Sequence, residues 1–228
     1  MTVVAIMQPT YLPYLGYFEL IAQSDIFVLL DDVQFERRSW QSRNRIMGAA
    51  GEVMLTVPVK KHAQAARIRD IEIAYDQPWR EKHLASVRHA YGSRPHLEAA
   101  IAFLEANFSK APAHLAALTG AVITEAAKAL NIPTRIVPAS ELACEGKRSD
   151  HLLAICRTLN ATTYLSTGGS REYLEADGAF AAANLPVRYH AFTPKPYPQG
   201  HDFTPYMAFI DAVANVGWTE TAALLDRR

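Results

Sequence analysis

The chain has 228 residues, half of them apolar, and is long enough to bury a substantial core. Its 23 Lys and Arg residues balance 23 Asp and Glu residues, so no overall field attracts nucleic acid or an anionic membrane surface, and phosphate recognition must be local. Two cysteines, Cys144 and Cys156, are too few for a secreted disulfide framework, which predicts a cytoplasmic protein. Pro9, Pro13 and Asp25 interrupt the apolar N-terminus, so we expect no membrane span.

Two apolar runs near the N-terminus each end in a polar segment. Val3 to Met7 leads into residues 8–17, and Ile26 to Leu30 leads into residues 31–45. Short apolar runs bounded by Pro or polar residues are typical of buried strands. If both strands lie in one parallel sheet, their carboxyl ends meet at the same edge, where α/β proteins usually bind ligands.

The middle of the chain predicts two insertions. Residues 52–59 and 68–73 alternate apolar and polar side chains, which predicts a β-ribbon within an insertion of about 50–75, with residues 60–62 as its loop. From Trp79 the apolar residues recur at spacings of three and four, which predicts a helical insertion of about 79–131.

Strand and helix patterns alternate in the last third of the chain. Strands are expected at 134–137, 162–165 and 187–192, and helices at 149–159, 171–177 and from about 204 to Gly217, with Ser149 as an N-cap. We therefore predict an α/β fold, a mostly parallel Rossmann-like sheet flanked by helices, with an inserted β-ribbon and helical region in a single domain over 1–228.

The turn after the first strand has the sequence Tyr14-Leu15-Gly16-Tyr17. It resembles the His-x-Gly-His turn of nucleotidylyltransferases and class I aminoacyl-tRNA synthetases at the glycine, with both histidines replaced by tyrosine. Gly16 would let a ligand approach the backbone, and the following helix offers free N–H groups. Tyrosine donates hydrogen bonds but does not carry the charge of an imidazolium.

A second turn, at residues 166–173, is similar to the Ile-Ser-Ser-Thr-x-x-Arg signature of the same superfamily. Ser166, Gly168 and Gly169 could form an anion-binding nest, with Arg171 as a phosphate or carboxylate clamp and Tyr173 beside it. The alternative is a glycine-rich strand-to-helix turn without a ligand.

The segment from Asp31 to Arg45 combines two aspartates with several arginines and a tryptophan. Asp31 and Asp32 could orient an amine, act as a general base or bind Mg²⁺. The accompanying binding candidates are Gln34, Arg38, Trp40, Arg43 and Arg45, of which the arginines suit diphosphate and the tryptophan offers a stacking face. In the alternative interpretation, the aspartates cap a loop and the arginines are solvated.

The Pro-rich segment 195–205 contains three further hydrogen-bonding candidates, Tyr197, Gln199 and His201. They could line a pocket, or the segment could only connect a strand to a helix. The remaining histidines, at 83, 89, 96, 114, 151 and 190, lack the spacing of metal ligands, so we expect no metal site.

Several motifs together resemble the WbqC-like proteins over nearly the whole chain. They are Gln8-Pro9-x-Tyr11-x-Pro13-x-x-Gly16-Tyr17-Phe18, Asp31-Asp32-Val33-Gln34, Arg38-x-Trp40-x-x-Arg43-Asn44, Thr56-Val57-Pro58-Val59, Tyr164-Leu165-Ser166 with Gly168, and Tyr197-Pro198-Gln199. That family occurs mainly in bacterial surface-polysaccharide (O-antigen) gene clusters, and the resemblance implies a role such as glycine transfer to an amino sugar.

The leading hypothesis is an acyl or aminoacyl transferase that acts on the amine of an amino sugar or nucleotide-linked sugar. Its expected partners are a nucleotide-linked sugar and an amino-acid or acyl donor, without nucleic acid; the sequence leaves the oligomeric state open. The catalytic candidates are Asp31, Asp32, Gln8 and Asn44. The substrate-binding candidates are Tyr11, Tyr14, Gly16, Tyr17, Gln34, Arg38, Trp40, Arg43, Arg45, Ser166, Gly168, Gly169, Arg171, Tyr173, Tyr197, Gln199 and His201.

Two alternatives remain at this point. One is a non-catalytic sugar-nucleotide-binding module. The other is an ATP-dependent adenylate-forming amide ligase of nucleotidylyltransferase-like fold, which would use ATP with Mg²⁺. The transferase hypothesis requires no cofactor.

Overall fold

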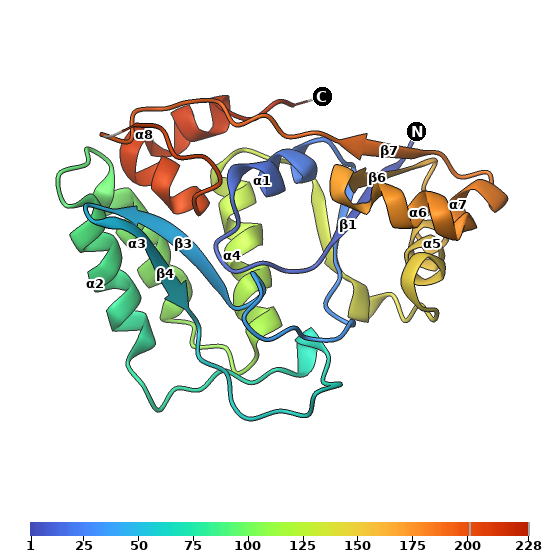
Figure 1. Ribbon diagram of the computed structural model, residues 1–228, viewed down its shortest axis with the longest axis horizontal. Coiled ribbons are helices and arrows are strands. Elements are labelled where there is room, and N and C mark those ends of the chain that lie inside the picture. Colours follow the sequence, from blue (N-terminus) through green and yellow to red (C-terminus); the bar gives the residue numbers. More distant parts are fainter. Residues whose placement is uncertain (201, 228) are drawn as a thin grey trace.

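The main sheet has five parallel strands in the order β5-β2-β1-β6-β7 (Figure 1). The computed structural model describes residues 1–200 and 202–227. The strands are β1 (Val3–Met7), β2 (Ile26–Leu29), β5 (Arg135–Pro138), β6 (Thr163–Thr167) and β7 (Val187–His190). Each overlaps a strand that the sequence predicted, so the predicted α/β fold with a Rossmann-like sheet is confirmed.

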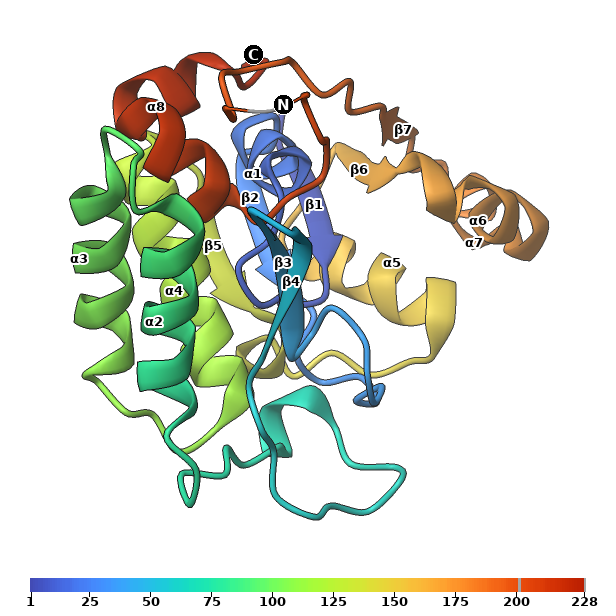
Figure 2. The same cartoon turned by 60° about the vertical axis from the view of Figure 1, so that its left-hand side comes forward.

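Helices cover both faces of this sheet because its side chains alternate between two cores. In β1, Val3 and Ala5 join one core cluster, and Val4 and Ile6 join the other. The first cluster includes α1 (Leu15–Ala22), α4 (Leu115–Ala129) and α8 (Phe209–Ala223). The second includes α5 (Arg148–Thr158), α6 (Arg171–Asp177) and α7 (Ala179–Ala182), which lie on the opposite side in Figure 2.

The inserted ribbon consists of β3 (Arg43–Gly48) and β4 (Gly51–Thr56), which pair antiparallel. The prediction that residues 52–59 pair with 68–73 was therefore wrong in its partner strand. Ile68–Asp70 forms a 3-10 helix, η1, and an isolated bridge joins Val59 to Ile73. Helices α2 (Trp79–Tyr91) and α3 (Leu97–Phe108) stand next to α4 and beside the ribbon, and share the first core (Figure 2).

Two predicted details of the helices differ in the structure. Ser149 does not cap α5; its hydroxyl donates to Asp177 Oδ2 at 2.7 Å. The last helix begins at Phe209, later than the expected start near residue 204. The predicted stop at Gly217 coincides with a break, because Gly217 has a non-helical φ of +78° and ψ of 171° and a second helical piece follows it. Glycine adopts such a positive φ at little cost.

The carboxyl ends of β2 and β5 lie side by side, with Leu29 opposite Pro138. Two loops therefore start at the same edge of the sheet: the segment from Leu30 onward, and the segment that begins with the 3-10 helix η2 (Ala139–Glu141) and leads to α5. This edge holds the largest of the cavities described below.

Candidate functional site

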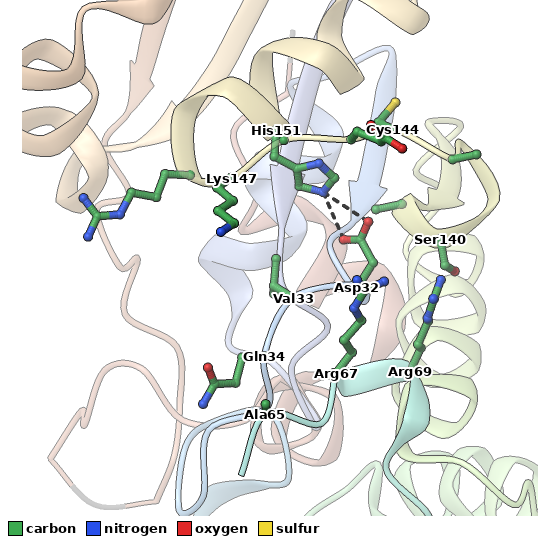
Figure 3. A pocket seen from close by; sticks show the side chains of 15 residues that line it. Asp32, Val33, Gln34, Ala65, Arg67, Arg69, Ser140, Cys144, Lys147 and His151 are labelled. Atoms are coloured by element: carbon green, nitrogen blue, oxygen red, sulfur yellow. Dashed lines mark hydrogen bonds and ion pairs between the residues drawn. The ribbon is translucent and has the colours of Figure 1, made fainter. Parts of the chain in front are cut away.

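A cavity of about 900 Å³, called here the sheet-end cavity, opens beyond the ends of β2 and β5. Three segments line it: residues 32–34 after β2, residues 65–69 around the start of η1, and residues 139–151 from η2 to the first turn of α5. Figure 3 shows side chains from all three converging on one space. The position agrees with the general rule for open α/β sheets, in which ligands bind outside the carboxyl ends of the strands.

Asp32 and His151 form a close pair in this cavity. His151 Nε2 lies 3.2 Å from Oδ1 and 3.1 Å from Oδ2 of Asp32, and the two side chains are only 9% and 10% exposed (Figure 3). With Nε2 donating to the carboxylate, the second nitrogen, Nδ1, is buried and has no hydrogen-bond partner. A carboxylate held at the wall of a cavity can act as a general base when a substrate proton lies within hydrogen-bond reach.

Cationic side chains surround this pair. Arg67, Arg69, Lys147 and Arg148 line the cavity, against the carboxylates of Asp32 and Glu145. In Figure 3, Arg67 and Arg69 rise from the η1 segment toward Asp32 and Ser140, and Lys147 enters from the other side. Such an excess of positive charge, with two guanidinium groups, suits a phosphate or diphosphate.

Asp31 has a different role from Asp32. Its Oδ1 accepts from the backbone N–H of Ser140 at 2.9 Å, and its Oδ2 accepts from the Ser140 hydroxyl at 2.7 Å. Its backbone carbonyl accepts from the Arg69 N–H, and the residue is only 6% exposed. Both carboxylate oxygens are thus used to hold η2 beside the cavity, and the backbone carbonyl of Asp31 holds the η1 segment.

Gly146 fixes the position of His151. Its φ is +129°, and a Cβ there would lie 2.8 Å from the backbone nitrogen of His151. Both the conformation and the close approach require glycine. The loop from η2 to α5 can therefore present His151 to Asp32 only with glycine at this position.

Gln8 and Asn44, expected to be catalytic, bind other parts of the protein. Gln8 Oε1 accepts from Gln41 at 2.8 Å, and Asn44 Nδ2 donates to the carbonyls of Tyr11 and Leu12 at 3.1 and 2.8 Å. Tyr11 is fully buried, and its hydroxyl lies 2.8 Å from His83 Nδ1. These contacts fasten the loop after β1 to the ribbon.

The turn at Tyr14 to Tyr17 is filled by aromatic packing. Tyr17 is 1% exposed and donates to the carbonyl of Gln8 at 3.0 Å, and Tyr14 contacts the rings of Phe192 and Tyr206. A Cβ on Gly16 would come within 2.6 Å of the Phe192 ring and would also meet Tyr14. Gly16 thus allows the aromatic rings to pack against this turn.

The arginine-bearing segment divides between two surroundings. Gln34 lines the sheet-end cavity, whereas Arg38 and Arg43 line a separate cavity beside the ribbon. Arg45 pairs with Glu52 at 2.9 Å and lies 5.9 Å from the ring of Trp40, which is 49% exposed.

The late turn lies toward β7, away from the sheet-end cavity. Ser166 is buried and donates to the Tyr164 hydroxyl at 3.3 Å. Arg171 packs over the Tyr189 ring at 4.2 Å and approaches Glu175 at 3.8 Å, both at the surface. Gly168 and Gly169 are exposed in the 3-10 helix η3 (Gly168–Ser170), and Tyr173 is 43% exposed.

Tyr197 and Gln199 belong to a buried network around Asp211. The Asp211 carboxylate accepts from Tyr197 at 2.6 Å, from Gln199 at 2.8 Å and from Tyr91 at 2.6 Å. Burial, followed by the charge of Asp211, raises the pKa of Tyr197. This network ties the Pro-rich segment to α8. His201, the third candidate in that segment, lies outside the described residues.

Asp32 and Gln34 are therefore the sequence candidates that line the sheet-end cavity. Asp31 holds one of its walls in place through the hydrogen bond from Ser140. The other described candidates lie at the ribbon, around α1 and α8, or near β7. The sequence analysis missed the other polar side chains that line the cavity, among them Arg67, Arg69, Ser140, Lys147, Arg148 and His151, which is the partner of Asp32. One signal for them existed: the loop after the strand at 134–137 ends at the same sheet edge as Asp32.

Residues 1–200 and 202–227 contain neither a cluster of metal-binding side chains nor a helix that could span a membrane. No cluster of three or more His, Cys, Asp or Glu side chains there is placed to hold a metal ion. None of the helices in that part of the chain has the length and apolar character needed to cross a bilayer.

Comparison with known proteins gives a family. The model of the WbqC-like protein family matches residues 8–223. A protein of Mycobacterium tuberculosis named "Uncharacterized protein Rv1507c" is 28% identical over 218 residues, which cover 94% of each chain. No solved structure matches the chain. Since the family model spans almost all of the sequence, including the segments that build the sheet-end cavity, this chain belongs to the WbqC-like protein family.

Proposed function

We propose that the protein is an acyl or aminoacyl transferase that modifies the amine of a nucleotide-linked amino sugar in surface-polysaccharide biosynthesis. The observation that carries this proposal is the Asp32–His151 pair inside a cavity lined by four cationic side chains. The cations would bind the diphosphate of the sugar nucleotide, and the pair would act on its amine.

The size and charge of the cavity support a nucleotide-linked substrate. About 900 Å³ lies near the upper end of ordinary small-molecule sites. Arg67 and Arg69 offer forked donors that suit paired phosphate oxygens, and Lys147 adds a point charge from the opposite side (Figure 3). These groups would hold the diphosphate while the sugar extends toward Asp32.

The reaction would be a direct transfer. The amine nitrogen forms a bond to the carbonyl carbon of the donor, the nitrogen's proton passes to the Asp32 carboxylate, and the donor's leaving group departs with its electron pair. A base within hydrogen-bond reach and cations near the developing oxyanion supply the catalysis. Glycine is the amino acid that we propose for transfer, on the basis of the family resemblance alone.

Asp32, and not Asp31, is the proposed base. Both oxygens of Asp31 are occupied by Ser140, whereas Asp32 faces the cavity with His151 as its partner. His151 is a positioning residue, because its Nε2 orients the carboxylate and its buried Nδ1 has no accessible surface.

The packing of the N-terminal turn favours the transferase over the adenylate-forming ligase. Tyr17 is buried and hydrogen-bonded to the Gln8 carbonyl, and Tyr14 packs against two aromatic rings. Neither tyrosine side chain is therefore free to bind a triphosphate in the way the histidines of the ligase turn would. The non-catalytic binding module remains an outcome of the experiment below.

We also propose that the protein works in the cytoplasm. Both cysteines are free, and Cys156 is buried, which fits a reducing compartment.

The test is complementation of a strain that lacks the gene, followed by mass spectrometry of its surface sugars. Wild-type protein should restore a mass equal to one amino-acid residue, 57 Da in the case of glycine on the proposal made here, at about the level of the parent strain. Asp32→Asn should reduce the product at least tenfold, and Asp76→Asn, an exposed control, should not.

The same variants separate the alternatives. A nucleotide-sugar complex that forms without any mass change in the polysaccharide would establish the binding module. Full product with Asp32→Asn would remove Asp32 from the mechanism.

A further inference from the structure

A second cavity, called here the ribbon cavity, lies between the β3–β4 ribbon and the segment that precedes it. It has a volume of about 370 Å³ and is lined by some of residues 35–43 and by all of residues 56–62. The hydrogen bond from the Val57 N–H to the Ser42 carbonyl, 2.8 Å long, joins two of its walls. Several of these residues belong to motifs that the sheet-end cavity does not use.

The lining of the ribbon cavity is strongly cationic. Arg37, Arg38, Arg43, Lys60 and Lys61 all contribute to it, and none of its described lining residues is a carboxylate. Lys60 is paired with Glu72 at 2.6 Å, so its charge is partly balanced, whereas the other four cationic residues have no carboxylate among the lining residues. Since like charges that converge on one space repel each other, this arrangement favours a bound counter-anion.

Arg43 supplies a second, independent observation. It occupies the first position of β3, opposite Thr56, and its Nε–H is buried without a hydrogen-bond partner. Buried donors in proteins nearly always have an acceptor, so an unpaired one indicates a place where a ligand can supply the acceptor. An oxyanion in the ribbon cavity would supply the acceptor.

Arg38 lines the cavity at a position where the backbone turns, with a left-handed φ of +59°. The apolar side of the cavity, formed by Phe35 and Val57, is almost fully buried and lowers the local dielectric constant, which strengthens charge pairing.

The two cavities lie on opposite sides of a short antiparallel pairing. The Phe35 N–H donates to the Ala66 carbonyl at 2.9 Å, and a bridge joins Gln34 to Arg67. Successive side chains of an extended segment point in opposite directions, so Gln34 lines the sheet-end cavity and Phe35 lines the ribbon cavity. One ligand group therefore cannot occupy both.

We propose that the ribbon cavity is a second anion site, which binds the phosphate group of a phosphorylated small molecule other than the ligand of the sheet-end cavity. Arg38 and Arg43 are its principal ligands, and Lys61 contributes charge. The inference does not depend on the reaction proposed above.

The test is calorimetric titration of the whole protein with inorganic pyrophosphate at low salt. Wild-type protein should bind two equivalents. The double variant Arg38→Gln with Arg43→Gln should bind one equivalent, in the sheet-end cavity. The double variant Arg67→Gln with Arg69→Gln should also bind one equivalent, in the ribbon cavity. Arg88→Gln with Arg157→Gln removes two charges from exposed helical positions and should keep both.

The outcomes distinguish this inference from the proposed function. Two results would overturn the ribbon site. One is that the Arg38 and Arg43 double variant still binds two equivalents of pyrophosphate. The other is that wild-type protein binds one equivalent, and that the Arg67 and Arg69 double variant binds none. Loss of one equivalent only with the Arg38 and Arg43 variant would support the ribbon site and refute phosphate binding in the sheet-end cavity.

Two further arms cover folding and ligand class. If circular dichroism shows that the double variant is unfolded, Arg38→Gln and Lys61→Gln alone, both at exposed positions, should each raise the Kd at least threefold, and an unchanged Kd would overturn the site. Acetate at equal ionic strength should not displace pyrophosphate; equal displacement would refute the assignment to phosphate.

Discussion

His83 makes the stability of this protein depend on pH in a way that can be calculated from the structure. The residue lies on α2, is 5% exposed, and places Nδ1 2.8 Å from the Tyr11 hydroxyl and Nε2 3.2 Å from the Thr56 carbonyl. A neutral ring with hydrogen on Nε2 satisfies both contacts, since the Thr56 carbonyl can only accept. Burial lowers the pKa of His83 from 6.5 to about 4, although the bond to Thr56 opposes this shift.

The sign follows from the lowered pKa. Between pH 6.5 and about 4, the unfolded chain binds a proton at His83 and the folded chain does not, so acid favours unfolding. The stabilisation is present above pH 6.5 and is lost as the pH falls through the folded pKa. A difference of roughly 2.5 pKa units is worth about 3 kcal/mol, of which about 2.5 kcal/mol is gone by roughly pH 4.5.

Urea unfolding followed by circular dichroism at pH 7.5, 6.0, 5.0 and 4.5 measures this contribution. His83→Gln should be less stable than wild type at pH 7.5, because it loses the paired contacts, and the difference should shrink by about 2 kcal/mol toward acid pH. His89→Gln, at an exposed position of the same helix, should keep the wild-type slope. Parallel pH profiles for wild type and His83→Gln would refute this reasoning.

Three further predictions concern the site and its supports. Gly146→Ala should lower both Tm and the affinity for a UDP-linked amino sugar, because the new Cβ would meet the His151 backbone. Gly178→Ala is the control: its φ of +66° is also positive but the space around it is open, so it should lower Tm alone. Equal losses of affinity in the two variants would contradict this prediction. Asp211→Asn should cost about 3 kcal/mol of unfolding free energy, since one amide oxygen cannot accept all three hydrogen bonds. Adding Tyr197→Phe to this variant should cost little more. Additive losses would show that the network is not coupled. Asp31→Asn should destabilise the protein more than Asp32→Asn, by about 1 to 2 kcal/mol, while Asp32→Asn should reduce product more; the reverse order would exchange their roles.

The main sheet could be predicted because its strands carry their signal locally. β1 and β2 are short apolar runs that end in polar segments, and both are buried in the centre of the sheet. The ribbon partner could not be predicted in this way, because β3 has the sequence RNRIMG and shows no apolar alternation. Ile68, Ile71 and Ile73 have a strand-like pattern and are all buried, but Ile68 lies in a 3-10 helix, Ile71 follows that helix directly, and Ile73 forms only an isolated bridge with Val59.

The candidate site was harder to predict because its parts are distant in sequence. Asp32 meets His151 across 119 residues, and periodicity does not report such pairings. Many of the motif residues serve instead to hold loops in place: Asn44 fastens the loop after β1, and Gln199 binds Asp211. Polar residues that form specific internal hydrogen bonds look like site residues in a sequence.

The most direct test of the account is a crystal structure of the protein soaked with a UDP-linked amino sugar. We predict electron density for the diphosphate within hydrogen-bond distance of Arg67 and Arg69, with the sugar amine facing Asp32. A diphosphate bound at the turn after β1 or in the ribbon cavity, with the sheet-end cavity free of ligand density, would contradict the central claim.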